Sequence, residues 1–187
     1  MKNIGVLASH GGSNLQAVID GTKTGILNAS VSVVISNNKG AFALERARLE
    51  GIPAICLTQK NDGNMLRTLQ KHQVDILVLA GYLKKVNPLV IEAYKDCIFN
   101  IHPSLLPKYG GKGMYGLNVH RAVIESGDKY TGATIHRVTG EYDDGEILAQ
   151  NRVPVMPEDS PESLAARVLA TEHSLLVETL HKILAML

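Results

Sequence analysis

Short apolar runs alternate with longer amphipathic segments in the first half of the chain. The runs at residues 4–8, 31–36, 54–57 and 76–79 are predicted strands, and the segments at residues 15–21, 42–50 and 65–72 are predicted helices. This alternation is typical of strand–helix–strand units, which build a parallel sheet. Because the predicted strands are apolar throughout, we expect helices on both faces of that sheet.

The pattern changes after Thr131. Residues 131–138 and 147–155 predict two strands joined by the polar segment 141–145, which favours an antiparallel pair. A long helix is predicted after Ser160 as N-cap and Pro161 as first residue. Its apolar face comprises Leu164, Val168, Leu175, Leu176, Leu180, Ile183 and Leu187. The predicted fold class is α/β: a doubly wound, mostly parallel, Rossmann-like sheet with an antiparallel C-terminal addition and a long terminal helix.

Composition narrows the class of protein. With 187 residues, 45% of them hydrophobic, we expect a single domain over residues 1–187, as a monomer or weak homodimer. A net charge of +1 disfavours a nucleic-acid partner. No apolar run suits a signal peptide or a membrane span, so we expect a cytoplasmic protein without a membrane partner. Cys56 and Cys97 lack the spacing of metal ligands, so no metal site is expected.

The first chemical candidate is the segment Asn100-Ile101-His102-Pro103, which follows a predicted strand at residues 97–99. Alternate side chains of a strand point to one face, so Asn100 and His102 can converge on one reacting atom. Pro103 and Pro107 predict a stiff turn beyond them. This arrangement favours a catalytic pair; the structural alternative is that neighbouring backbone groups satisfy both side chains.

The second candidate is the loop Ser9-His10-Gly11-Gly12-Ser13-Asn14, which precedes a helix predicted from Leu15. Glycines bring backbone amides close to a ligand, Ser13 and Asn14 add donors, and the helix N-terminus adds partial positive charge. We therefore predict a phosphate site. The loop matches neither the dinucleotide nor the P-loop pattern, which disfavours those cofactors. The structural alternative is a plain turn with Ser13 as N-cap.

Two carboxylates are further candidates. Asp143 lies in the polar segment between the two predicted C-terminal strands, where it could meet His102 and raise the pKa of that imidazole. The structural alternative is an ordinary turn, for which Asp-Asp-Gly is a common sequence. His136, on the preceding strand, is a candidate for the same site. Glu172 lies on the apolar face of the terminal helix and needs a partner, either a ligand hydroxyl or a Lys or Arg at the helix margin.

These motifs together resemble one family. Ser9-x-x-Gly-Ser-Asn14, Leu79-Ala-Gly-Tyr82, Asn100-Ile-His-Pro-Ser-Leu-Leu-Pro107 and Asp143-x-Gly145 occur in order, as in the phosphoribosylglycinamide formyltransferase family of folate-dependent formyltransferases. The resemblance covers essentially the whole chain. The His-Pro-Ser-Leu-Leu-Pro motif is specific for the wider superfamily. We expect no room for the additional domains of methionyl-tRNA formyltransferase or formyltetrahydrofolate deformylase, and the phosphate loop favours a phosphoribosyl substrate.

The resemblance implies an activity. A formyl group would pass directly from 10-formyltetrahydrofolate, as co-substrate, to the amine of glycinamide ribonucleotide in de novo purine (IMP) biosynthesis, without a metal. Asn100 would hold the formyl oxygen. Protonated His102 would stabilise the tetrahedral oxyanion and supply a proton to the departing folate nitrogen. Asp143 would raise the pKa of His102 and help to move the proton from the amine.

The resemblance also implies binding residues. Those for the ribonucleotide are Gly12, Ser13, Asn14, Gly81 and Glu172. Those for the folate are Lys60, Leu83, Lys84, Lys85, Val86, Asn100, Thr139, Gly140, Glu141, Tyr142 and Asp143. The half of the chain before about residue 99 would bind phosphate, and the half from about residue 100 would bind folate and carry the catalytic residues.

One segment departs from the family pattern. Where a short Pro-Gly turn is common, this chain has Gly110-Gly111-Lys112-Gly113-Met114-Tyr115-Gly116, which predicts a mobile loop that covers the site or reshapes the amine pocket. Three alternative functions stay open. They are a hydrolase that uses the same three residues on 10-formyltetrahydrofolate, a formyltransferase for another amine, and a non-catalytic phosphate-binding module.

Overall fold

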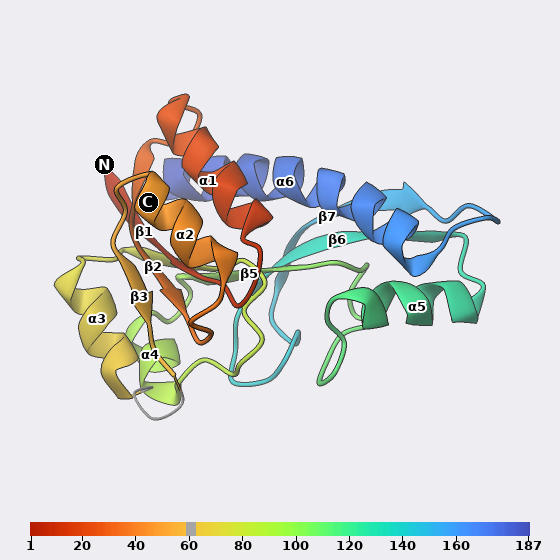
Figure 1. Cartoon of the computed structure of the whole chain (residues 1–187), viewed down its shortest axis with the longest axis horizontal. Coiled ribbons are helices and arrows are strands. Elements are labelled where there is room, and N and C mark those ends of the chain that lie inside the picture. The colour runs from red at the N-terminus through yellow and green to blue at the C-terminus, as the bar shows by residue number, and fades with distance from the viewer. Residues whose placement is uncertain (59–62) are drawn as a thin grey trace.

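The computed structural model describes residues 1–58 and 63–187, and these residues form a seven-stranded sheet between two layers of helices (Figure 1). In chain order the elements are β1 (Lys2–Leu7), α1 (Ser13–Lys23), β2 (Ala29–Ser36), α2 (Phe42–Leu49), β3 (Ala54–Cys56), α3 (Met65–Lys71), β4 (Ile76–Leu79), α4 (Pro88–Ala93), β5 (Ile98–His102), α5 (Leu117–Ser126), β6 (Tyr130–Arg137), β7 (Ile147–Pro154) and α6 (Pro161–Met186).

The strand order is β3-β2-β1-β4-β5-β6-β7. The first five strands in that order are parallel, and β6 and β7 are antiparallel to their neighbours. The predicted fold class is therefore confirmed. The chain builds outward from β1 to β2 and β3 on one side and to β4 and β5 on the other. Doubly wound sheets bind ligands at such a reversal, beyond the carboxyl ends of the strands.

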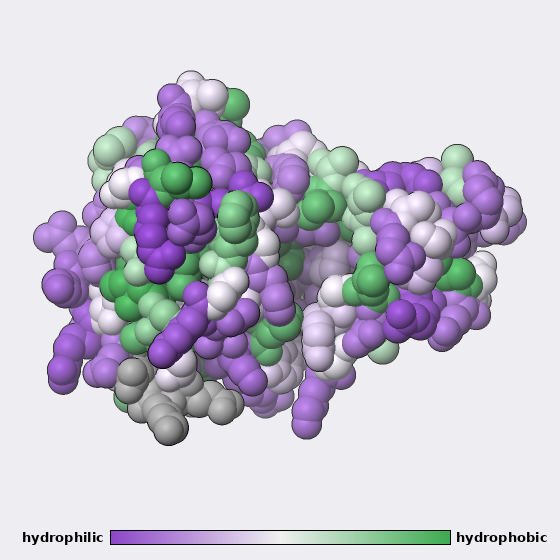
Figure 2. Space-filling model, viewed as in Figure 1, coloured by the Kyte–Doolittle hydropathy of each residue, from purple (hydrophilic) through white to green (hydrophobic). Residues whose placement is uncertain are grey.

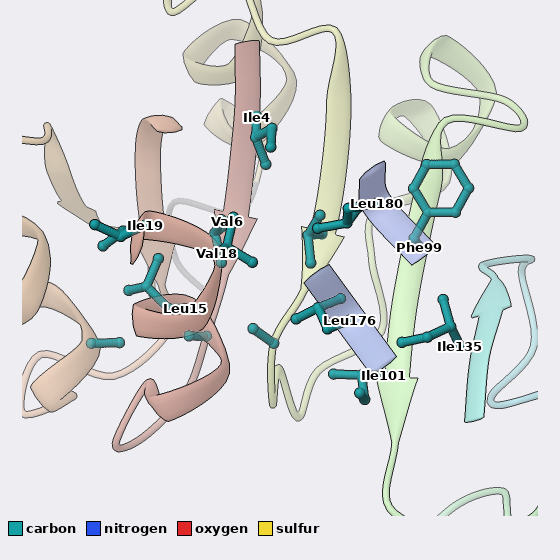
Figure 3. Packing of buried hydrophobic residues seen from close by; sticks show 14 of the residues in the cluster. Ile4, Val6, Leu15, Val18, Ile19, Phe99, Ile101, Ile135, Leu176 and Leu180 are labelled. Carbon is teal, nitrogen blue, oxygen red and sulfur yellow. The ribbon is translucent and has the colours of Figure 1, made fainter. Parts of the chain in front are cut away.

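Strand side chains alternate between two apolar cores. Val6 of β1 and Phe99 of β5 belong to the core under α1, α2 and α6, whereas Leu7 and Ile98, their direct neighbours, belong to the core under α3 and α4. Figure 3 shows the first core, with Leu176 of α6 packed over the central strands. Because β5 alternates in this way, Asn100 and His102 share the face of Ile98.

Helix α6 begins as predicted. The Ser160 hydroxyl accepts a hydrogen bond from the Ser163 amide, and Pro161 is the first helical residue. The predicted apolar positions of α6 up to Leu180 are buried, but Leu187 lies beyond the helix end and is 57% exposed, so its prediction as a core position is wrong.

No helix in the described part of the chain has the length and apolarity to cross a membrane.

Two element boundaries near the candidate site differ from the prediction, and two helices were not predicted. β5 continues through Asn100 to His102 because β6 pairs alongside, with Asn100 opposite His136 and His102 opposite Thr134. α1 begins at Ser13, two residues before the predicted start. Helices α4 and α5 were not predicted, although the Asn87 side chain accepts from the Leu89 amide as a cap at 2.9 Å before Pro88, which is a recognisable start signal.

The α6 packing generates a stability prediction. Leu176→Ala removes a fully buried side chain and should lower the free energy of unfolding by about 2–5 kcal/mol. The matched control Leu187→Ala should change it by less than about 0.5 kcal/mol, because Leu187 is exposed. Urea denaturation measures both values, and equal losses in the two variants would contradict this account of α6.

Candidate active site

Backbone geometry after β1 builds the predicted phosphate loop. Gly12 is the N-cap of α1 with φ of 71°, and a Cβ atom there would lie 2.8 Å from Ala43 Cβ and 2.9 Å from Ala43 Cα. Only glycine therefore lets α1 approach α2 so closely. Because the N-cap is Gly12, the alternative that Ser13 caps the helix is wrong. Arg46 Nε donates to the Gly11 carbonyl at 2.8 Å and holds the loop.

A pocket with about 1010 Å³ of empty volume opens beside this loop. It is lined by His10, Gly11, Gly12, Ser13, Asn14, Ala80, Gly81, Leu83, Tyr115, Gly116, Leu117 and Asn118. In Figure 2 the surface is hollowed between the first turns of α1 and α5. The Ser9 amide donates to the Gly81 carbonyl at 3.0 Å, which joins the ends of β1 and β4 at the reversal of strand order. We call this the loop pocket.

The loop pocket brings together four of the five predicted ribonucleotide residues, namely Gly12, Ser13, Asn14 and Gly81. The contribution of α5 was not predicted, because the loop 110–116 separates this helix from the motif. Leu83, one of the residues predicted to bind folate, lines the loop pocket, where the chain turns after Gly81 and Tyr82 at the end of β4.

Glu172 does not line this pocket but is hydrogen-bonded to Asn14, which does. Glu172 is 7% exposed, and its carboxylate accepts from Asn14 Nδ2 at 2.6 Å, so its protein partner is neither the Lys nor the Arg that the sequence suggested. Burial raises the pKa of the Glu172 carboxyl, and the hydrogen bond from Asn14 only partly opposes that rise. The Oδ1 atom of Asn14 is buried and has no hydrogen-bond partner within the described residues.

Four polar side chains converge at the end of β5. Asp143 Oδ1 lies 3.4 Å from Asn100 Nδ2 and 3.5 Å from both His102 Nδ1 and His136 Nε2. The three predicted catalytic residues are therefore neighbours. His136, a candidate left out of the predicted catalytic set, completes the cluster because it lies opposite Asn100 on β6.

Hydrogen bonds define the state of His136 and Asn100. The carbonyl of Arg137 accepts from His136 Nδ1 at 2.7 Å, so the ring proton of a neutral His136 lies on Nδ1. His136 Nε2 then accepts from Asn100 Nδ2 at 3.0 Å. Asn100 thus directs one amide hydrogen to His136 and the other to Asp143 at a longer 3.4 Å, and the longer contact is the weaker one.

His102 is buried between two acceptors. Its side chain is 5% exposed, Nε2 donates to the Tyr109 carbonyl at 2.8 Å, and Nδ1 faces Asp143. Burial lowers the pKa of His102 and outweighs the opposing effects of Asp143 and the Tyr109 carbonyl. Asp143 therefore raises the pKa of His102, as predicted, but desolvation is the larger effect and the net shift is downward.

Asp143 is positioned by the loop after β5. Its Oδ2 atom accepts from the Gly111 amide at 2.8 Å, and a Cβ atom at Gly110 would lie 3.1 Å from Asp143 Cβ. Burial raises the pKa of the Asp143 carboxyl, but His136, His102 and the Gly111 amide together lower it below its usual value. Asp143 is therefore an anion at neutral pH.

A second pocket, with about 460 Å³ of empty volume, opens on the other side of the β4 end. It is lined by Leu79, Tyr82, Lys84, Lys85, Val86, Ile91, Asn100, His136, Val138, Thr139, Gly140, Glu141, Tyr142 and Asp143. We call it the β4–β6 pocket. Nine of the predicted folate residues are among them, whereas Lys60 lies outside the described residues. Ile91 in its wall belongs to α4, an element that was not predicted.

Charged side chains bridge the rim of the β4–β6 pocket. Lys85 Nζ lies 3.0 Å from Glu141 Oε2 and 5.4 Å from the centre of the Tyr142 ring. The ion pair is largely exposed, so it contributes little to stability. It places a cation and an anion where a charged ligand would enter.

Comparison with known proteins identifies the family. Residues 2–180 match the formyl transferase family model, so the chain belongs to that family, and the resemblance read from its motifs is confirmed. It is 46% identical to a chloroplastic phosphoribosylglycinamide formyltransferase of Vigna unguiculata over 95% of this chain but only 59% of the plant protein. It therefore spans less than two thirds of that relative.

Bacterial relatives match in length as well. The chain is 40% identical to phosphoribosylglycinamide formyltransferase of Escherichia coli K12, over 92% of this chain and 82% of that protein. The crystal structure of glycinamide ribonucleotide transformylase 1 from Symbiobacterium toebii superposes with a TM-score of 0.93 at 38% identity, covering 100% of this chain and 89% of that one.

The buried Glu172 generates a pH prediction. Because its pKa is raised in the folded protein, the carboxyl is easier to ionise when unfolded, so its contribution to stability is largest below its ordinary pKa of 4.5 and declines as pH rises through the folded value. Glu172→Gln removes this decline. Urea denaturation from about pH 4 to about pH 8 should show the variant gaining stability over wild type as pH rises. A constant difference across that range would contradict the raised pKa.

Proposed function

We propose that the protein transfers a formyl group from 10-formyltetrahydrofolate to the amine of glycinamide ribonucleotide. The observation that carries this proposal is the relation between two pockets and one polar cluster. Leu79 and Tyr82 line the β4–β6 pocket, while Ala80, Gly81 and Leu83, between and beside them, line the loop pocket. Two substrates bound there would meet at the end of β4, beside Asn100. The names of the bacterial and plant relatives support both the reaction and the acceptor.

The loop pocket suits the ribonucleotide. The first amides of α1 and the Ser13 hydroxyl would hold its phosphate. The free Oδ1 atom of Asn14 would accept from a ribose hydroxyl, and Glu172 behind it would fix the Asn14 amide and meet a second hydroxyl. These roles account for a buried acceptor and a buried carboxylate that the fold itself leaves poorly satisfied.

The β4–β6 pocket suits the folate. Its inner wall is apolar, with Leu79, Val86 and Ile91, and its inner end reaches Asn100 and Asp143. Backbone groups of the segment 139–143 would pair with the heterocycle, and Lys84 and Lys85 at the rim would attract the carboxylates of its glutamate tail. The pocket would thus present the formyl group to the polar cluster.

The polar cluster would then stabilise the charges that develop during formyl transfer. As the amine attacks the formyl carbon, Asn100 would turn its weaker amide hydrogen from Asp143 to the developing oxyanion. Neutral His102 would take the proton released by the amine, and the adjacent Asp143 carboxylate would stabilise the imidazolium. Return of that proton to folate N10, as the C–N10 bond breaks, yields the formylated ribonucleotide and tetrahydrofolate.

The loop 110–116 would link the two substrates. Gly111 donates to Asp143, while Tyr115 and Gly116 line the loop pocket. Movement of this loop would therefore affect both the acceptor and the carboxylate. That mobility, the cytoplasmic location and the monomer or weak homodimer stay predictions.

A direct test follows tetrahydrofolate formation from 10-formyltetrahydrofolate by absorbance, with and without glycinamide ribonucleotide. We expect turnover only with the ribonucleotide. His102→Ala should lower kcat about 10²- to 10⁴-fold, because it removes the group that carries the proton. The matched control His181→Ala, on the exposed side of α6, should keep wild-type turnover.

Each alternative predicts a different result. Equal turnover without the ribonucleotide would identify a hydrolase. Turnover with another amine alone would identify a transferase of different specificity. A His102→Ala variant as active as wild type would contradict a catalytic role for the polar cluster.

A further inference from the structure

A third depression lies apart from the two pockets of the proposed active site. It has about 620 Å³ of empty volume and shares no lining residue with the loop pocket or the β4–β6 pocket. Its walls come from Lys108 and Tyr109 after β5, from Lys129 and Tyr130 at the start of β6, and from Arg152 of β7. We call it the β6–β7 depression.

The β6–β7 depression is cationic. Lys108, Lys129 and Arg152 face a single carboxylate, Asp128, so two positive charges are uncompensated. Lys108 Nζ pairs with Asp128 Oδ2 at 2.8 Å. Within the described residues, neither Lys129 nor Arg152 has an acidic partner. A dianion would therefore match the charge of this surface better than a monoanion.

Among the residues that the structure describes, Arg152 contacts an aromatic ring and donates no hydrogen bond. Its guanidinium carbon lies 4.3 Å from the centre of the Tyr130 ring. Stacking occupies the face of a guanidinium and leaves its N–H edges free, and those edges bind two oxygens of a phosphate at once. Arg152 is thus preorganised as an oxyanion donor.

The wall of the β6–β7 depression also contacts the catalytic imidazole. The Tyr109 carbonyl accepts from His102 Nε2 at 2.8 Å, and the Tyr109 hydroxyl donates to Asp128 Oδ2 at 2.8 Å. Asp128 therefore binds both Lys108 and Tyr109. An oxyanion that draws Lys108 away from Asp128 would alter the clamp on Tyr109, whose carbonyl fixes the orientation of His102.

We propose that the β6–β7 depression binds the phosphate group of a small molecule through Arg152, Lys129 and Lys108, and that its occupancy lowers turnover through Tyr109 and His102. The ligand is either free phosphate or a phosphate monoester. Its binding does not depend on the proposed formyl transfer, whereas its effect on turnover rests on that function; calorimetry tests the binding without turnover, so the two proposals can fail separately.

Isothermal titration calorimetry with inorganic phosphate, at constant ionic strength, tests the binding. Wild type should bind two phosphates, one in the loop pocket and one in the β6–β7 depression. Arg152→Met should bind one. Lys182→Met, which removes an equal charge from the exposed side of α6, should still bind two. Equal stoichiometry in wild type and Arg152→Met would overturn the proposal. A second variant, Lys129→Met, repeats the test on an exposed side chain and should weaken phosphate binding at the β6–β7 depression several-fold.

A kinetic measurement tests the coupling. With both substrates saturating, phosphate should lower kcat of wild type about fivefold and saturably, and should leave kcat of Arg152→Met unchanged. Equal inhibition of both proteins would overturn the coupling. Repeating the titration with glycerol 3-phosphate distinguishes the sources: tighter binding of the ester identifies a phosphorylated metabolite, and tighter binding of inorganic phosphate identifies the free ion.

Discussion

Burial of the His102 imidazole between two hydrogen-bond acceptors is the constraint on which the site depends. The Tyr109 carbonyl accepts a hydrogen bond from Nε2, and the Asp143 carboxylate faces Nδ1 at 3.5 Å. Desolvation lowers the pKa of the ring and so favours its neutral form, while both neighbours favour the cation. His102 can therefore accept a proton when charge develops beside it, and the surrounding acceptors are already in place. Such preorganisation avoids moving polar groups during the reaction.

The sheet supplies the positions that this constraint requires. β5 carries Asn100 and His102 on one face, and pairing with antiparallel β6 places His136 opposite Asn100. The reversal of strand order at β1 brings the phosphate loop beside the end of β4, so that two pockets adjoin one edge. Gly12 allows α1 to approach Ala43, and Gly110 lets the next loop reach Asp143. A residue without a Cβ atom is therefore needed at both of these close approaches.

Much of the fold could be predicted because its signals are local. The apolar runs of β1, β2 and β4 and the Ser160-Pro161 start of α6 fall at or near the predicted positions. Motif residues such as Asn100, His102 and Asp143 could be grouped because strand ends meet at one sheet edge. Leu187 was predicted on the buried face of α6 but is exposed, because helical periodicity does not show how far the packed surface beneath a helix extends. The side of β4 that Leu83 faces depends on the turn after Gly81, which has φ of 77°.

Properties of the site that depend on residues far apart in the sequence could not be predicted from the spacing of residues within a motif. The sequence suggested that Asp143 would raise the pKa of His102, and it does, but burial by the surrounding elements is the larger effect and lowers that pKa. Likewise, the partner of Glu172 is Asn14, which lies far away in sequence and meets it only when α1 packs against α6. The cationic β6–β7 depression also escaped notice, because its charges come from three separate segments with no shared motif.

Nitrogen-15 NMR of the histidine side chains in the free protein tests the central claim most directly. His102 should titrate below its ordinary pKa of 6.5, with its neutral ring protonated on Nε2, and Asp143→Asn should lower that pKa further because it removes the charge that favours the cation. A His102 pKa above 6.5, or a neutral ring protonated on Nδ1, would contradict the account.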